Sequence, residues 1–169
     1  MDSRFRGNDI YGVGMTNIRR ERQGSLFMSY PLDVKNMFEL SSIPLENMDL
    51  RKGLRSSQAG AFNCFEGWVR DHNEGKKVLA LEYQAYESLC YKEAEKIFCE
   101  VNERFDVIAA RCYHRQGKLA IGEMAVWVGV IAGHRDESFQ ACRYIIDQVK
   151  ARLPIWKKTD ARRRQSGTR

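Results

Sequence analysis

The chain has 169 residues, of which 43% are hydrophobic and 30% charged, a composition typical of a folded protein large enough for one ordinary core. The net charge of +6 lies at the two ends, because residues 1–24 carry +2, residues 161–169 carry +4, and residues 25–160 are neutral. A neutral folded part argues against a nucleic-acid partner, and the lack of any apolar run near the ~20 residues of a membrane span argues against a membrane protein, so we expect a cytoplasmic location.

The sequence divides into three parts. Residues 1–29 are rich in Gly, Arg, Asn and Ser and lack the apolar segment of a secretory signal, so we expect a disordered N-terminal extension. Residues 30–160 form a single predicted domain. Residues 161–169 contain four Arg and no acidic residue and are predicted to be a basic C-terminal tail.

The first half of the domain is predicted to contain strands and one long helix. We expect a strand at 37–40, a short helix at 44–54, a strand at 60–70, a loop at 71–75 and a returning strand at 78–83. From 88 to 105 the apolar period becomes helical. The apolar face of that helix consists of Cys90, Ala94, Ile97, Phe98, Val101 and Phe105.

The second half repeats this alternation. Strands are predicted at 107–113, 119–121 and 124–132, separated by Gly117 and Gly122, and a helix follows at 136–153. Pro154 ends that helix, and 155–157 is predicted to be extended. The order of elements predicts a single-domain α+β fold, in which two long helices cover a largely antiparallel sheet.

Several kinds of site are disfavoured by the sequence. The five cysteines lie in apolar patterns with no Cys-x-x-Cys pair, so we interpret them as reduced core residues. No histidine has metal-ligand spacing, and no Walker or Rossmann glycine pattern is present, so we expect neither a metal site nor a nucleotide site. His114 precedes Gly117 and is expected to hold a turn.

The last predicted helix carries a lysine beside its apolar face. At 100° per residue, Lys150 falls about 20° from Phe139, at the edge of the apolar arc. Lys157 follows Pro154 and is predicted to return to the same neighbourhood. Both lysines have a simpler interpretation, because the helix dipole favours a lysine in the last turn, and Lys157 could flank Trp156 on an edge strand.

Three further cations lie at the ends of predicted strands. Arg70 ends one strand, and His134 and Arg135 lie between an apolar strand and a helix N-terminus. Helix N-terminal amides attract anions, and an arginine offers paired donors to phosphate. A solvated strand end and a helix cap are the alternatives. If these residues join the two lysines in one cavity, the substrate should carry phosphate or carboxylate.

Several motifs occur together in one order. They are 65–75 (FEGWVRDHNEG), 81–86 (LEYQAY), 114–117 (HRQG), 122–130 (GEMAVWVGV), 134–135 (HR), 144–147 (YIID) and 154–158 (PIWKK). With these motifs the chain, from about residue 38 to residue 158, resembles the large, catalytic subunit of molybdopterin synthase, the MoaE family. The resemblance implies a hammerhead-type α+β fold and a homodimer. It also implies a small ubiquitin-like sulfur-carrier subunit at each end of that dimer, and so a heterotetramer.

The resemblance also implies an activity that needs no metal and no bound cofactor. The C-terminal Gly-Gly of the carrier, as a thiocarboxylate, would enter the large subunit and give sulfur, twice, to cyclic pyranopterin monophosphate (precursor Z). The product would be the dithiolene of molybdopterin. By this resemblance Arg70, His134 and Arg135 bind the substrate phosphate and pterin, Lys150 lies beside the terminal glycine of the carrier, and Lys157 exchanges a proton.

Two parts of the chain depart from the family pattern. Residues 159–169 stand where members have a Gly-containing turn and a strand bearing Trp-Val, and the residues before Met28 have no counterpart in the pattern. The alternative function is therefore a binding module that docks the carrier or a nucleic acid without catalysis.

Overall fold

The computed structural model describes residues 37–73 and 76–161, so the predicted N-terminal extension and the arginines of the predicted tail lie outside the described residues. The elements are β1 (Phe38–Ser41), η1 (Leu45–Asn47), β2 (Ala61–Trp68), β3 (His72–Asn73), β4 (Lys76–Ala85), α2 (Glu87–Arg104), β5 (Val107–Arg115), β6 (Gly117–Ala120), β7 (Met124–Ala132), α3 (Arg135–Arg152) and β8 (Ile155–Ala161). The predicted α+β class and single domain are confirmed.

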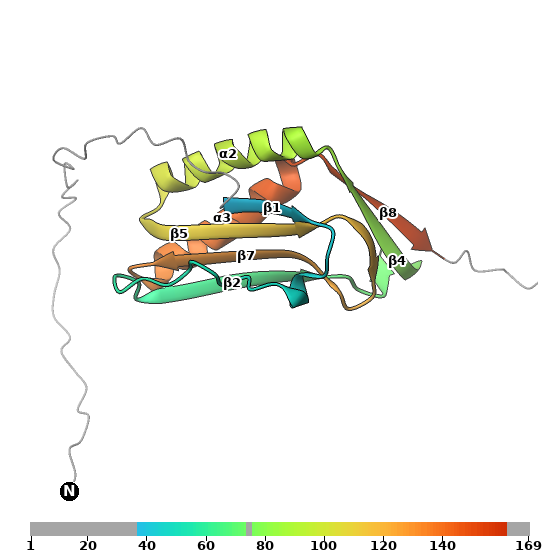
Figure 1. Ribbon diagram of the computed structural model, residues 1–169, viewed down its shortest axis with the longest axis horizontal. Coiled ribbons are helices and arrows are strands. Elements are labelled where there is room, and N and C mark those ends of the chain that lie inside the picture. Colours follow the sequence, from blue (N-terminus) through green and yellow to red (C-terminus); the bar gives the residue numbers. More distant parts are fainter. Residues whose placement is uncertain (1–36, 74–75, 162–169) are drawn as a thin grey trace, which may run out of the picture. The chain divides into compact units, whose positions relative to one another are not determined.

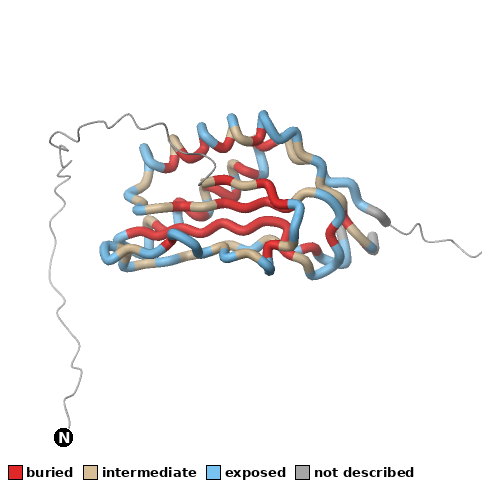
Figure 2. The backbone as a smooth tube through the Cα atoms, in the orientation of Figure 1, coloured by how far each residue is buried: buried red, intermediate tan, exposed pale blue. Residues whose placement is uncertain are grey.

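The main sheet has the strand order β1-β5-β7-β2. β7 is antiparallel to β5 and to β2, whereas β1 runs parallel to β5. Both helices lie against one face of this sheet, where α3 contacts β2, β5 and β7 and α2 contacts β1 (Figure 1). All nine residues of β7 are buried, and Figure 2 shows the same burial along the middle of the sheet. The prediction of a largely antiparallel sheet covered by two helices is confirmed.

The two helices bury the apolar faces that their periodicity indicates. In α2 the predicted residues from Cys90 to Val101 are buried, because a 3.6-residue period places them on one side. In α3 the buried residues include Cys142, Ile146 and Val149, but Phe139 is 56% exposed and lies off the buried stripe. Neither described helix is long and apolar enough to cross a membrane.

The predicted helix at 44–54 is largely wrong. Only the three residues of η1 form a helical turn, and Met48 is already extended. Two successive i to i+3 hydrogen bonds, from Lys52 to Asp49 and from Leu54 to Arg51, then carry the chain across the sheet face opposite the helices. This path buries both Leu45 and Leu54 in one cluster with Trp127. A continuous helix running through Met48 would not have let both leucines reach that cluster.

The predicted strand at 78–83 forms, but it does not pair with β2 as a returning strand would. It starts a second sheet instead. β4 pairs with β3, which lies within the predicted loop, with β6, and over most of its length with β8. β8 extends to Ala161, beyond the predicted extended piece at 155–157. Gly117 begins β6 and Gly122 follows it, with φ of +87° and +86°, conformations that favour glycine. β4 and β8 project from one end of the main sheet (Figure 1).

Candidate active site

The two predicted lysines lie on consecutive elements that meet at one pocket. Lys150 is in the last turn of α3, and the chain leaves the helix at Leu153, whose amide donates to the carbonyl of Val149. Pro154 prevents continuation of the helix, and β8 then pairs with β4 so that Lys157 lies opposite Tyr83. Lys150 and Lys157 both line a pocket of about 320 Å³.

Apolar side chains form most of the remaining pocket wall. They come from the end of α3, the start of β8 and the buried strand β7, because these three elements converge below the lysines. The apolar lining residues are Ala125, Val126, Ile146, Val149, Leu153 and Ile155. An anion that enters this pocket would therefore exchange water for a small apolar cavity with two ammonium groups at its edge.

The two ammonium groups have no ionic partner among the described residues. No described carboxylate lies within 4.0 Å of either lysine, whereas Arg152, in the same turn of α3 as Lys150, is 2.8 Å from a carboxylate oxygen of Glu100. The Nζ of Lys150 instead lies 5.4 Å from the centre of the Phe65 ring, where the aromatic face attracts a cation. The charge on the pocket side of α3 is thus available to a ligand.

Arg70 lies at the junction of the two sheets and does not line the lysine pocket. The preceding residue, Val69, is buried, and its backbone pairs with Gly122 and Glu123 on the turn between β6 and β7. The following residue, Asp71, accepts a hydrogen bond from the amide of Val78. Val78 precedes Tyr83 by five residues of β4, which separates these two residues by about 16 Å along the strand. Its side chain is exposed.

His134 and Arg135 are adjacent at the start of α3, where β7 ends. His134 is the N-cap residue, with extended backbone and no side-chain capping hydrogen bond, and both side chains are exposed. Gly60 approaches so closely that a Cβ on it would lie 2.3 Å from the carbonyl oxygen of Gly133. This glycine contact holds the turn that presents the His-Arg pair.

One chain does not bring all five predicted residues together. Arg135 and Lys150 are fifteen residues apart on one helix, which corresponds to about 22 Å. Within one chain, His134 and Arg135 therefore do not share a cavity with Lys150, because a continuous helix keeps its two ends apart. The two lysines do share one, because the turn at Pro154 folds the chain back onto the same pocket.

The pocket also contains a histidine that sequence reasoning assigned to a turn. His114 is 9% exposed and lines the pocket from β5, and its Nδ1 lies 2.8 Å from the carbonyl oxygen of Arg115. Tyr83 packs against the imidazole ring in an edge-on contact, with ring centres 5.1 Å apart. Alternation along β5 could have revealed this position, because His114 shares its strand face with Ala110 and Cys112, which pack toward the helices.

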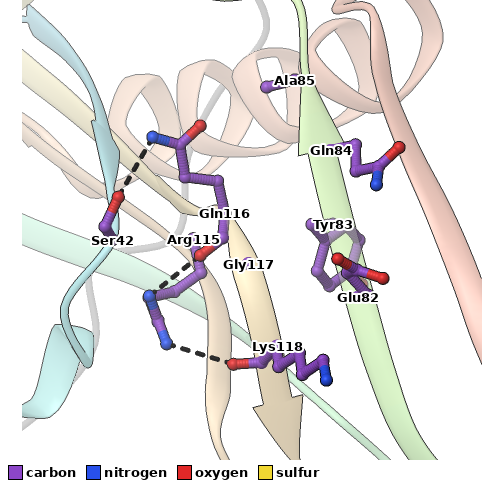
Figure 3. A pocket seen from close by; sticks show the side chains of 9 residues that line it. All are labelled: Ser42, Glu82, Tyr83, Gln84, Ala85, Arg115, Gln116, Gly117 and Lys118. Atoms are coloured by element: carbon purple, nitrogen blue, oxygen red, sulfur yellow. Dashed lines mark hydrogen bonds between the residues drawn. The ribbon is translucent and has the colours of Figure 1, made fainter.

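Tyr83 also lines a second pocket, of about 440 Å³ (Figure 3). Ser42, Arg115 and Gln116 lie on one side of it, and the β4 residues lie on the other. Arg115 is 5% exposed and donates to the carbonyls of Ser41, Gln116 and Lys118 at 3.2, 3.1 and 3.5 Å, while its Nε has no hydrogen-bond partner. These bonds tie the start of β6 to the end of β1 and so fix the strand end that carries His114.

The chain's own thiols do not form a reactive centre. All five cysteines are free, and Cys90, Cys112 and Cys142 are buried. Burial raises the pKa of the Cys90 and Cys142 thiols to about 11 and raises the pKa of Cys112 as well, which disfavours the nucleophilic thiolate. Within 37–73 and 76–161, no cluster of three His, Cys, Asp or Glu side chains is arranged to hold a metal ion.

Comparison with known proteins gives consistent matches. The family model "MoaE protein" matches residues 40–152. The molybdopterin synthase catalytic subunit of Pyrococcus abyssi is 46% identical over 103 residues, covering 61% of this chain and 70% of that protein. The corresponding subunit of Bacillus subtilis is 36% identical over 121 residues, covering 72% and 77%.

Solved structures match over a similar range. The crystal structure of molybdopterin synthase from Staphylococcus aureus is similar with a TM-score of 0.70 and 33% identity, covering 74% of this chain and 91% of that chain. A complex of subunits 1 and 2 of molybdopterin-converting factor from Helicobacter pylori shares the fold, with a TM-score of 0.58 at 20% identity and coverage of 78% and 92%.

Proposed function

Because this chain belongs to the MoaE family, to which the catalytic subunits of molybdopterin synthase belong, we propose that it transfers sulfur from the C-terminal thiocarboxylate of a small carrier subunit to cyclic pyranopterin monophosphate. Family membership gives the chain an enzymatic role in molybdenum cofactor biosynthesis. In the proposed reaction two successive transfers build the dithiolene of molybdopterin. The carrier supplies the sulfur, which agrees with buried cysteines whose pKa is raised.

The observation that carries this proposal is the pair of unpaired lysines at one small apolar pocket. Once the thiocarboxylate sulfur has bonded to the substrate, hydrolysis of the resulting thioester passes through a tetrahedral intermediate whose oxygen becomes negative. Both lysines are exposed in the free protein, so the entering carrier tail would have to exclude water from the pocket before these cations stabilise that oxygen more than water does. Lys150 is assigned this role, because the Phe65 ring and the end of α3 fix its ammonium group beside the pocket.

Lys157 is assigned the proton exchange. It lies across from Tyr83 on β8, on the strand face that lines the pocket, whereas Lys158 pairs with Glu82 and so occupies the opposite face. A flexible ammonium group at the pocket edge can donate a proton to a leaving oxygen and recover it from solvent. The narrow apolar lining suits a Gly-Gly tail, which has no side chains to accommodate.

We place the substrate phosphate on Arg70 together with His134 and Arg135 of a second copy of the chain. β2 is the outer strand of the main sheet, and on its free edge no described strand pairs with it. If two copies pair their β2 edges antiparallel about a two-fold axis, the start of one strand meets the end of the other. Ala61 lies opposite Ala132, just before His134, and Trp68 lies just before Arg70. This pairing would bring the three phosphate-binding candidates together.

Reconstitution tests the proposed reaction. The purified protein, a thiocarboxylated carrier and cyclic pyranopterin monophosphate should yield molybdopterin. Lys150→Ala should lower the rate by about 10²-fold or more, the usual cost of losing one oxyanion donor. Lys92→Ala, which removes an exposed lysine from α2, is the matched control and should keep the wild-type rate. Equal rates for the two variants would refute the role assigned to Lys150.

A further inference from the structure

We propose that His114 is the proton acceptor of the lysine pocket and acts through its Nε2. This inference rests on the proposed sulfur transfer and adds a third side chain to it. The imidazole lines the same pocket as Lys150 and Lys157 and comes from a different sheet than Lys157 does. The steps below derive its tautomer, its charge and its part in the reaction.

The hydrogen bond at Nδ1 fixes the tautomer. A backbone carbonyl oxygen only accepts, so the 2.8 Å contact between Nδ1 and the Arg115 oxygen assigns the ring proton of neutral His114 to Nδ1. Nε2 then carries a lone pair. The Arg115 guanidinium binds the carbonyls of Ser41 and Gln116 and so immobilises the segment that provides this acceptor. Tyr83 restrains the ring from the side, at an interplanar angle of 82°.

The surroundings keep the imidazole neutral. Burial lowers the pKa of His114. The charged and titratable side chains that share the pocket are Lys150 from α3, Lys157 from β8 and Tyr83 from β4, and Arg115 is its neighbour on β5. Positive neighbours also disfavour the imidazolium ion, and burial raises the pKa of the Tyr83 phenol, which stays uncharged.

No other described side chain in the pocket offers a nitrogen lone pair or a carboxylate. An ammonium group has donors but no acceptor, and a neutral phenol is a weak base. The remaining lining side chains are apolar. A reaction in this pocket that releases a proton at neutral pH therefore has His114 as its acceptor among the described residues.

The step that needs this acceptor is release of the carrier. After sulfur transfer, the terminal carbonyl carbon of the carrier is bonded to the sulfur of the substrate. Water adds to that carbon as Nε2 takes one proton from the water, and the carbonyl electron pair moves to an oxyanion beside Lys150. The intermediate then reforms the carbonyl and breaks the carbon–sulfur bond. Sulfur leaves with the electron pair as a thiolate, and the carrier leaves as a carboxylic acid that loses its proton to solvent. The proton on Nε2 passes to the thiolate or to solvent, which regenerates the base, and nothing is oxidised or reduced.

Two variants separate proton transfer from a structural role. His114→Asn places an amide donor near the Nδ1 position and keeps a donor for the Arg115 carbonyl but has no base. His114→Gln places a neutral amide near the Nε2 position, where it can hydrogen-bond but not accept a proton. Both should lower the rate of carrier release by about 10²-fold or more. Wild-type activity should fall as pH drops through the lowered pKa of His114, and the Asn variant should lose this acid limb.

The outcomes distinguish this inference from the function on which it rests. Nitrogen NMR of the full-length wild-type protein should show a protonated Nδ1 and an unprotonated Nε2, and the reverse assignment overturns the inference whether or not a variant folds. Wild-type turnover in His114→Asn would leave only a structural role, and wild-type turnover in His114→Gln would leave only a hydrogen bond. If the wild-type protein makes no molybdopterin while Nε2 is unprotonated, the sulfur-transfer proposal fails, and the inference fails with it.

Discussion

Replacement of Gly60 by alanine should destabilise the fold at the turn that presents His134 and Arg135. The added Cβ would lie 2.3 Å from the carbonyl oxygen of Gly133, about 1 Å closer than the ~3.3 Å at which carbon and oxygen normally meet. Neither backbone can yield freely, since Gly60 donates to Ala132 at 3.1 Å and the next residue is in the β2–β7 ladder. Overpacking of this kind costs about 1–3 kcal/mol.

Thermal unfolding followed by circular dichroism measures this cost. For a folded part of this size, about 4 °C per kcal/mol predicts a Tm lowered by roughly 4–12 °C. The matched control is Gly133→Ala, because a Cβ there meets no atom within 4 Å. If Gly60→Ala unfolds at the same temperature as Gly133→Ala, the close approach does not constrain this turn. If the turn also positions the His-Arg pair, the KM for the phosphorylated substrate should rise in Gly60→Ala alone.

Two further predictions concern charge and the second copy. The hydrogen bonds that Tyr144 and Arg152 donate to Glu100 hold the pKa of that carboxyl below its usual range. Their stabilisation is present above the unfolded pKa and lost as pH falls through the folded value, so the urea midpoints of wild type and Arg152→Ala should differ at pH 7 and converge below about pH 4. A difference between the two urea midpoints that stays constant with pH would contradict this prediction. For the shared site, mixing inactive Lys150→Ala with inactive Arg135→Ala should restore about a quarter of the wild-type activity, because one site in each mixed dimer is intact. No recovery after the subunits have exchanged would refute a site shared between two copies.

The elements predicted well from the sequence are those whose signal is local. α2 and the buried strand β7 carry their periodicity or apolar length within one segment, and both form close to the predicted residues. Strand pairing, in contrast, joins segments that are distant in the sequence. The residues of 78–83 carry no local signal that this strand pairs with β6 and β8 rather than with β2, so the sequence did not predict the second sheet. The segment at 44–54 has enough apolar residues for a helix, but it crosses the sheet face in turns and buries Leu45 and Leu54 there.

The same distinction applies to the site. Lys150 and Lys157 were found because a helix end, a proline and an apolar stripe all lie within one short stretch of sequence, and the structure places them at one pocket. His114 was overlooked because the nearby Gly117 gives a sufficient reason for a histidine in a turn. The His114 side chain points toward the helices only because they cover that face of β5, and the packing of the helices cannot be inferred from the local sequence.

Arg70, His134 and Arg135 mark a further limit of reasoning from one chain. Their residue types fit phosphate, yet the length of α3 holds Arg135 about 22 Å from Lys150. A helix of eighteen residues cannot bend to close that gap, so either the three residues serve another site or a second molecule closes the distance. The free edge of β2 favours the second molecule, because antiparallel pairing of two such edges joins the strand end near Arg70 to the strand start near His134.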